Sequence, residues 1–237
     1  MADAHGRSVG VRALRRRQGS GDVEVVVSAP VAVPAGWRRG DDRLCGLVVP
    51  EDAPIDRQRS DGRTPVLAAF DGPDRAVVAV DVCTVGWLGV PSAWLVPVGD
   101  AIVHSGLVSG LDVVLFGVAP GDLESPGARL HVASDADDLE HLVGQLVGDD
   151  EPVVVVAAGV DAAAVRRALD LGAAVVSDGD ERRAGANVIA AAGRWRLDPP
   201  GWPVDAVRSP PGFVRRPGYS PERSAPDARS AAISAGA

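Results

Sequence analysis

Lysine is absent from this sequence, so all 24 basic residues among the 237 are arginines. A Walker A loop is therefore excluded, because its lysine contacts the nucleotide phosphates. Schiff-base catalysis and the S-x-x-K nucleophile motif are excluded for the same reason. Asparagine and tyrosine occur once each, as Asn187 and Tyr219. This skew indicates a high-GC bacterium, and it leaves open a product with no retained activity.

Cysteine and long apolar runs are also scarce. Cys45 and Cys83 lie far apart and form no CxxC pair, so we expect two buried free thiols in a reducing cytoplasm. No run of 18 apolar residues exists, which argues against a membrane span. The basic cluster Arg15–Arg17 is followed by polar residues, and we therefore expect no signal peptide. The net charge of −8 makes nucleic-acid binding unlikely on sequence grounds.

The most regular stretch is EPVVVVAAGVDAAAVRRALDLGAAVVSDGD, residues 151–180. An apolar run, an amphipathic segment and a second apolar run predict a strand–helix–strand unit of a buried parallel sheet. Asp161 is the expected N-cap of the helix and Gly172 the residue just past its end. Val165 and Leu169 are expected to contact the core.

A second helix is predicted from Ser134. Ser134 and Asp137 approximate a capping box. A helical stripe of apolar residues follows, which is typical of a helix that lies on a sheet. Its members are Leu139, Leu142, Val143, Leu146 and Val147.

Shorter apolar runs predict the remaining elements. Strands are expected at 23–27, 66–70, 76–82, 94–98, 112–118 and 130–133, and helices at 31–43, 100–108 and 184–192. Asp71-Gly-Pro-Asp74 is a turn signal between two of these strands and indicates a hairpin or close crossover.

The whole pattern predicts an α/β protein with a doubly wound, mostly parallel, flavodoxin-like sheet in a Rossmann-like three-layer arrangement. The expected divisions are a disordered tail at 1–22, the α/β domain at 23–199 and a disordered proline-rich tail at 200–237.

Four segments occur in the order seen in the receiver domain of bacterial response regulators. They are VEVVVSAPVAVPAGWRR (23–39), DVVLFGVAPGD (112–122), PVVVVAAGVDAAAVRRALDLGAAVV (152–176) and VIAAAGRWRLDP (188–199). The chain thus resembles receivers of two-component signalling, especially those that precede LuxR-type helix-turn-helix domains. The last segment would be the closing helix, and residues around 50–93 would be an insertion. No helix-turn-helix domain is predicted after Asp198.

The resemblance places neutral residues at the positions that perform receiver chemistry. Ser28 and Ala29 stand where receivers carry a magnesium-binding acidic pair, and Gly117 stands at the phosphoacceptor position. Ser177–Asp180 stands where receivers carry the lysine that contacts the phosphoryl group. The resemblance therefore implies a pseudo-receiver that cannot be phosphorylated at the usual aspartate. In an alternative register, 76–82 is the first strand and Asp81 a single surviving acid.

Site candidates are few. Asp178 and Asp180 follow a predicted strand and are weak candidates for a metal site. Gly159 precedes a predicted helix N-terminus, where an anion could be admitted. We predict no catalytic residue and no cofactor.

The leading functional hypothesis is a non-catalytic regulatory or protein-interaction module that binds a protein partner or forms a homodimer. The alternative is a small α/β enzyme, or a nucleotide- or metal-binding protein, using strand ends near Gly117, Gly159 and Asp178.

Overall fold

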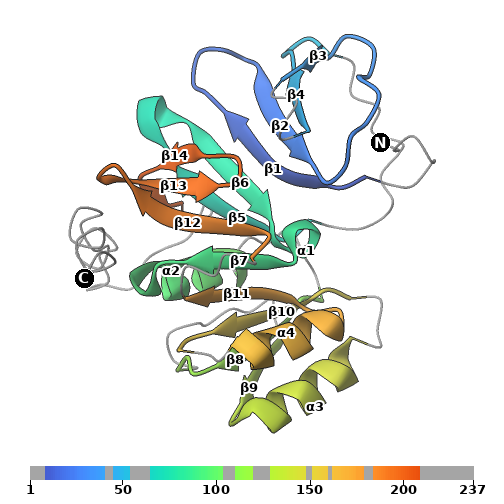
Figure 1. The fold of residues 1–237 in the computed structure, drawn as a ribbon, viewed down its shortest axis with the longest axis vertical. Helices are drawn as coiled ribbons and strands as arrows, with labels where there is room; N and C mark the ends of the chain where they lie inside the picture. Colours follow the sequence, from blue (N-terminus) through green and yellow to red (C-terminus); the bar gives the residue numbers. More distant parts are fainter. Residues whose placement is uncertain are drawn as a thin grey trace.

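Two β-sheets dominate the computed structural model (Figure 1). The structure describes residues 9–40, 45–53, 65–103, 110–119, 129–147, 151–159, 162–178 and 184–208. Among these residues no helix is both long enough and apolar enough to cross a bilayer.

The first sheet is antiparallel throughout and has the strand order β15-β5-β6-β1-β2-β4-β3. Its strands are β1 (Val11–Arg16), β2 (Val23–Val27), β3 (Arg38–Arg39), β4 (Gly46–Val49), β5 (Leu67–Asp71), β6 (Val77–Asp81) and β15 (Ala206–Val207). Strands β5 and β6 form the expected hairpin, with the short 3₁₀ turn η2 (Pro73–Arg75) between them.

Strand β1 occupies a segment that was expected to be a disordered tail. It lies between β2 and β6 and pairs with both. Its arginines hide the strand pattern, because an arginine stem can cover apolar surface while its head stays polar. The Arg15 guanidinium lies 4.9 Å from the ring centroid of Trp202. At the described positions of 31–43 the structure has the two-residue strand β3 instead of a helix.

The second sheet has eight strands in the order β14-β13-β12-β7-β11-β10-β8-β9. Its strands are β7 (Trp87–Val90), β8 (Asp112–Phe116), β9 (Arg129–Ala133), β10 (Val153–Ala157), β11 (Ala174–Asp178), β12 (Ala186–Ala191), β13 (Arg194–Asp198) and β14 (Trp202–Val204). Strands β9, β8, β10, β11, β7 and β12 are parallel, whereas β13 and β14 extend the sheet in antiparallel pairings.

The α/β class is confirmed, but the connectivity is not that of flavodoxin. Numbered along the chain, the six parallel strands have the order 3-2-4-5-1-6, whereas a flavodoxin-like sheet has the order 2-1-3-4-5. The residues expected to be an insertion around 50–93 instead supply β5, β6, the short helix α1 (Val82–Val85) and the central strand β7. The prediction of a single sheet is wrong, because the chain forms two separate sheets.

The strand–helix–strand unit is confirmed. Strands β10 and β11 pair in parallel, and α4 (Ala162–Asp170) connects them. Gly172 has φ +104°, and its N–H donates to the Leu169 carbonyl while Ala173 N–H donates to that of Ala168. These two bonds close the helix as a Schellman motif. The expected N-cap, Asp161, lies outside the described residues.

Helix α3 (Ala136–Leu146) carries the predicted apolar stripe, and Leu139 and Val143 are its most buried members. Its N-cap is Asp135 and not Ser134, since Asp135 Oδ1 accepts from the N–H groups of Asp137 and Asp138. Ser134 donates its N–H and hydroxyl to Asp138 Oδ2. These bonds hold the pKa of Asp138 below its ordinary value.

Helix α2 (Ser92–Val103) replaces the strand expected at 94–98 and includes residues 100–103, the described part of the helix expected at 100–108. It contacts β5 and β15 on one side and β10 and β11 on the other. A helix between two sheets is apolar nearly all round, so it lacks the periodicity of a surface helix.

The C-terminal part of the domain is made of strands. The helix expected at 184–192 is strand β12, and β12 and β13 form a hairpin instead of a receiver's closing helix. Strands β14 and β15 lie within the expected disordered tail, of which residues 209–237 are outside the described part. Val188, Ile189 and Ala190 fit a short strand as well as a helix, because a short apolar run carries no period.

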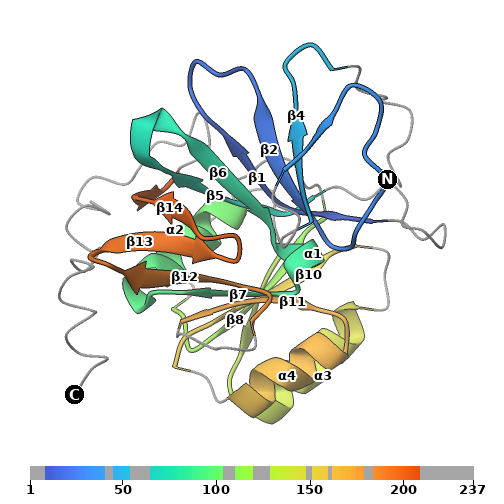
Figure 2. The same ribbon diagram turned by 45° about the horizontal axis from the view of Figure 1, so that its top comes forward.

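The layers follow from these contacts (Figures 1 and 2). The largest core cluster lies between the two sheets around α2, and includes Phe70, Trp94 and Leu197. A second cluster joins the other face of the parallel strands to α3 and α4. Cys45 and Cys83 are free thiols as predicted, although Cys83 is exposed and Cys45 half-buried.

Candidate functional site

The carboxyl ends of the parallel strands converge at one edge of the eight-stranded sheet. Strand β10 lies between β8 and β11, and β11 pairs with β7. Helix α2 follows β7 on one face, whereas α4 follows β10 on the other. In open α/β sheets, ligands bind beyond the carboxyl ends of the strands. We call this region the carboxyl edge.

The structure brings three of the predicted positions together at the carboxyl edge. Gly159 N–H donates to Asp178 Oδ1 over 2.7 Å. Gly117 has φ +67°, and a Cβ added there would lie 2.5 Å from the Ala158 carbonyl oxygen. The described residues that follow β10 are thus fastened to the end of β11, and they pack against Gly117 after β8.

This closure limits the chemistry of the carboxyl edge. No side chain fits at Gly117 unless the backbone moves, since its φ and the Ala158 oxygen both oppose a Cβ. The Asp178 carboxylate already accepts the Gly159 N–H, and Asp180 lies outside the described residues. Among the residues whose placement is given, no three His, Cys, Asp or Glu side chains form a group suited to a metal.

The positions that the receiver resemblance assigned to one site belong to different sheets. Ser28 and Ala29 follow β2 of the antiparallel sheet, where Ser28 Oγ accepts from Gly10 N–H over 3.2 Å. Gly117 follows β8 of the other sheet. In the alternative register, Asp81 caps helix α1 by accepting from Cys83 N–H and the Thr84 hydroxyl. Asp81 therefore has a structural role.

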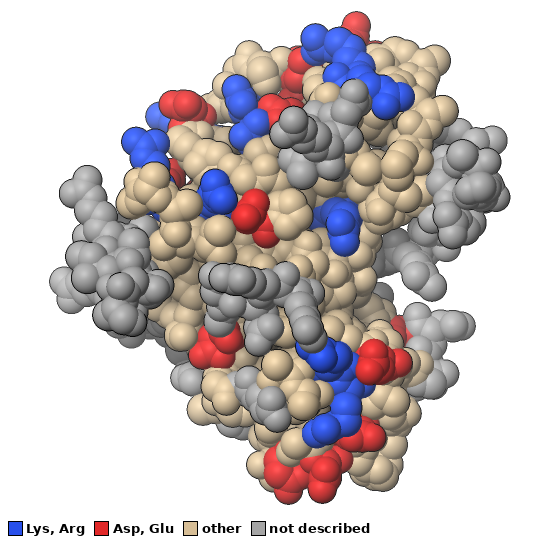
Figure 3. Space-filling view, viewed as in Figure 1, with Lys and Arg blue, Asp and Glu red and all other residues tan. Residues whose placement is uncertain are grey.

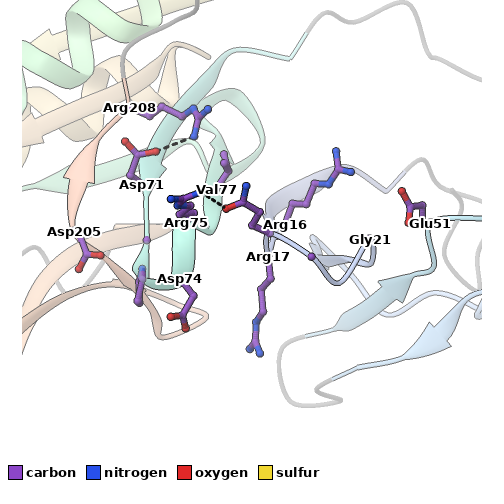
Figure 4. A pocket seen from close by; sticks show the side chains of 14 residues that line it. Arg16, Arg17, Gly21, Glu51, Asp71, Asp74, Arg75, Val77, Asp205 and Arg208 are labelled. Atoms are coloured by element: carbon purple, nitrogen blue, oxygen red, sulfur yellow. Dashed lines mark hydrogen bonds and ion pairs between the residues drawn. The ribbon is translucent and has the colours of Figure 1, made fainter.

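A large open pocket lies at one end of the antiparallel sheet (Figure 4). Its walls are the β1–β2 turn, the β5–β6 turn, Glu51 and the segment that joins β14 to Arg208. Its volume is about 910 Å³. We call it the inter-turn pocket. The charged residues that line it are Arg16, Arg17, Arg75, Arg208, Glu51, Asp71, Asp74 and Asp205.

Few of these charges neutralise each other. Arg208 Nη1 lies 2.9 Å from Asp71 Oδ1, and Arg75 Nη1 donates to Gln18 Oε1 over 3.5 Å. Within the described part of the chain, Arg16, Asp74 and Asp205 form no ion pair. The pocket therefore presents charges of both signs to a ligand.

The rim of the inter-turn pocket includes a tight hairpin turn. Asp74 and Arg75 have φ values of +56° and +54°, and Ala76 N–H donates to the Pro73 carbonyl over 3.1 Å. Two successive left-handed residues are the pattern of a type I′ turn, which β-hairpins favour. The Asp71-Gly-Pro-Asp74 signal predicted the turn, but nothing in the sequence showed that Gln18 and Arg75 would meet.

A charged cluster lies at the opposite, amino edge of the parallel strands. Asp112 has a side-chain exposure of only 2%. Its oxygens accept from Arg129 Nε at 2.9 Å and Nη2 at 2.6 Å, and His131 Nε2 lies 2.8 Å away. Arg129 also contacts Glu151. No local sequence pattern indicates this cluster, because its residues come from three separate segments.

The cluster controls the ionisation of its buried acid. Burial alone raises the pKa of Asp112, but the hydrogen bonds and charges of Arg129 and His131 outweigh it and hold the pKa below its ordinary value. The carboxylates of Asp112 and Glu151 raise the pKa of Arg129. The cluster links the edge strand β9 to β8, so we assign it a structural role.

Comparisons with known proteins identify no family for this chain. No family model and no curated protein matches the chain. One solved structure with detectable likeness is that of the pCW3 conjugation coupling protein TcpA, monomer form, with ATPγS. The match is 10% identical, covers 75% of this chain and 72% of that one, and has a TM-score of 0.31. Likeness at that level supports no conclusion on fold or function.

Proposed function

We propose that this chain is a non-catalytic regulatory or protein-interaction module. The observation that carries the proposal is that the described groups of the carboxyl edge bind or pack against one another. There, the Ala158 carbonyl lies against Gly117, and Asp178 is bonded to Gly159 N–H. An α/β protein that uses this edge for catalysis needs room and available polar groups there.

A large open concave surface among the described residues is instead the inter-turn pocket. Its walls come from turns and from the segment after β14, and loops on a rigid scaffold are common binding elements. Arginine and acidic side chains are interspersed over the face shown in Figure 3. A mixed surface of this kind favours selective protein contacts over general attraction to polyanions.

A site-specific photo-crosslinking experiment tests the proposal. A photoreactive residue replaces Gln18, which lines the inter-turn pocket. The matched control replaces Gln145, an exposed glutamine on α3. In cells of the source organism we expect a discrete crosslinked product from position 18 and none from position 145. A product that contains two copies of this chain identifies a homodimer. Absence of any product from position 18 contradicts the proposal.

A nucleotide- or metal-binding protein is the second candidate. It is favoured by the convergence of Gly117, Gly159 and Asp178 at a position where such ligands bind in other α/β sheets. A thermal-shift screen with ATP, GTP and Mg²⁺ separates the two candidates. A ligand at 100 times its Kd adds about 2.7 kcal/mol of stability. The interaction module predicts no shift, whereas a saturable shift establishes the second candidate.

A further inference from the structure

We propose that the inter-turn pocket binds a short peptide segment of a protein partner that carries both an acidic and a basic side chain. This inference rests on the proposed function, because it names the chemistry of the partner. It starts from the charges that the pocket leaves unneutralised.

The lining contains four arginines and four carboxylates, so its formal charge is zero. A compact polyanion such as phosphate is therefore poorly matched, because the four carboxylates of the lining offset the attraction of its four arginines. A ligand with one charge of each sign can use both sets of groups.

Two acids and two arginines lie apart within the pocket. Figure 4 shows Asp74 and Asp205 toward one wall, whereas Arg16 ends β1 and Arg17 begins the turn that follows it. Asp71 is paired with Arg208, so it is already neutralised. Arg17 has only a loose contact with Glu24, at 3.5 Å. Each place also offers the other sign, since Arg75 follows Asp74 and Glu51 lies against Gly21 of the β1–β2 turn.

The size and openness of the pocket favour a peptide over a small zwitterion. A volume of about 910 Å³ lies at the upper end of the range for drug-sized ligands. Pro73 and Val77 are the apolar side chains of the lining, too few to enclose a small molecule. A peptide segment gains from backbone contacts as well as from its two side chains.

The rim supplies polar backbone at fixed positions. Gly72 N–H donates to the Ala76 carbonyl at 2.8 Å, and Ala76 N–H donates to that of Pro73 at 3.1 Å. These bonds hold the turn residues Asp74 and Arg75 in place. A pre-formed rim lowers the ordering cost of binding.

The test is an NMR titration of the full-length protein with four matched capped peptides. The first has one glutamate and one arginine separated by two glycines. In the other three, glutamine replaces the arginine, the glutamate or both. The reporters are the backbone amide signals of Gly19 and Gly72, which line the pocket. Inorganic phosphate serves as a fifth probe.

We expect the mixed-charge peptide to shift both reporters, and each charge removed to weaken binding by about threefold. In the double variant Arg16→Glu with Arg17→Glu, peptides with and without the glutamate should bind equally well. In the double variant Asp74→Arg with Asp205→Arg, peptides with and without the arginine should bind equally well. Arg194→Glu, a charge reversal at an exposed position on β13 outside the pocket lining, is the control and should change nothing.

Three outcomes overturn the inference: no reporter shift with any peptide, equal binding of all four peptides, or phosphate binding that exceeds that of the mixed-charge peptide. If one of these outcomes occurs but a partner still crosslinks at position 18, only the mixed-charge peptide inference is wrong and the proposed function stands. If no partner crosslinks at position 18, the proposed function itself is wrong.

Discussion

The carboxyl edge and the inter-turn pocket differ in how their polar groups are used. At the carboxyl edge, Asp178 is bonded to Gly159 N–H and the Ala158 carbonyl fills the space beside Gly117. In the inter-turn pocket, Arg16, Asp74 and Asp205 form no ion pair with another described residue. Groups engaged within the fold contribute to stability, whereas unengaged groups are available for binding. Substitutions at the two places should therefore differ in kind.

The largest effect is expected from Gly117→Ala. The added Cβ opposes both the left-handed backbone and the Ala158 oxygen, which lies 2.5 Å from its position. We expect a loss of about 3 kcal/mol in the free energy of unfolding, measured by urea denaturation. Gly144→Ala is the control, because Gly144 lies inside α3 with open space around it. That change should stabilise by up to about 1 kcal/mol. Equal effects at the two glycines would contradict a closed carboxyl edge.

A smaller loss, about 2 kcal/mol, is expected from Asp112→Asn at neutral pH, because a buried carboxylate loses its charge-assisted bonds. Asp205→Asn is the exposed control and should change stability by less than about 0.5 kcal/mol.

The pH dependence of the Asp112→Asn effect has a definite sign. The pKa of Asp112 in the folded protein lies below the ordinary value of 3.8. Its contribution is therefore present above the unfolded pKa and is lost as the pH falls through the folded one. The difference between wild type and variant should shrink below about pH 4 in denaturation experiments. A difference that is constant from pH 7 to pH 3 shows that the cluster does not stabilise the ionised acid.

Asp178→Ala should cost about 1 kcal/mol, since it removes the acceptor of the Gly159 N–H while water can reach that exposed amide. Hydrogen exchange at Gly159 should also accelerate. Unchanged exchange and unchanged stability together would show that this bond does not fasten the turn after β10 to the end of β11.

The smallest effect on stability is expected in the inter-turn pocket. Arg16→Glu with Arg17→Glu should change the free energy of unfolding by less than about 0.5 kcal/mol, because both side chains are exposed. The same variant should lose the position-18 crosslink. A large loss of stability would show that these arginines support the fold instead of a partner.

The sequence predicted the parallel part of the molecule better than the antiparallel part. The β10–α4–β11 unit and α3 carry strong local signals: long valine runs, a 3.6-residue stripe and a glycine at a helix end. The first part of helix α2 is wrongly predicted as a strand, because both sides of the helix are buried. Strand β1 was missed because its arginines conceal an apolar pattern.

The sites were predicted only where they follow from strand ends. Gly117, Gly159 and Asp178 were expected near one another because parallel strands end at a common edge. The inter-turn pocket depends on long-range antiparallel pairing, such as Arg16 opposite Val77. The sequence contains no local signal for that register, so Gln18 and Arg75 could not be paired in advance.

The most direct test of the difference between the two places is an amide NMR comparison on one labelled sample of the full chain. The reporters are Gly117 and Gly159 for the carboxyl edge, and Gly19 and Gly72 for the inter-turn pocket. We predict that the mixed-charge peptide shifts the second pair and that ATP with Mg²⁺ shifts neither. Saturable shifts of Gly117 and Gly159 with the nucleotide, and none of Gly19 and Gly72 with the peptide, would contradict the account.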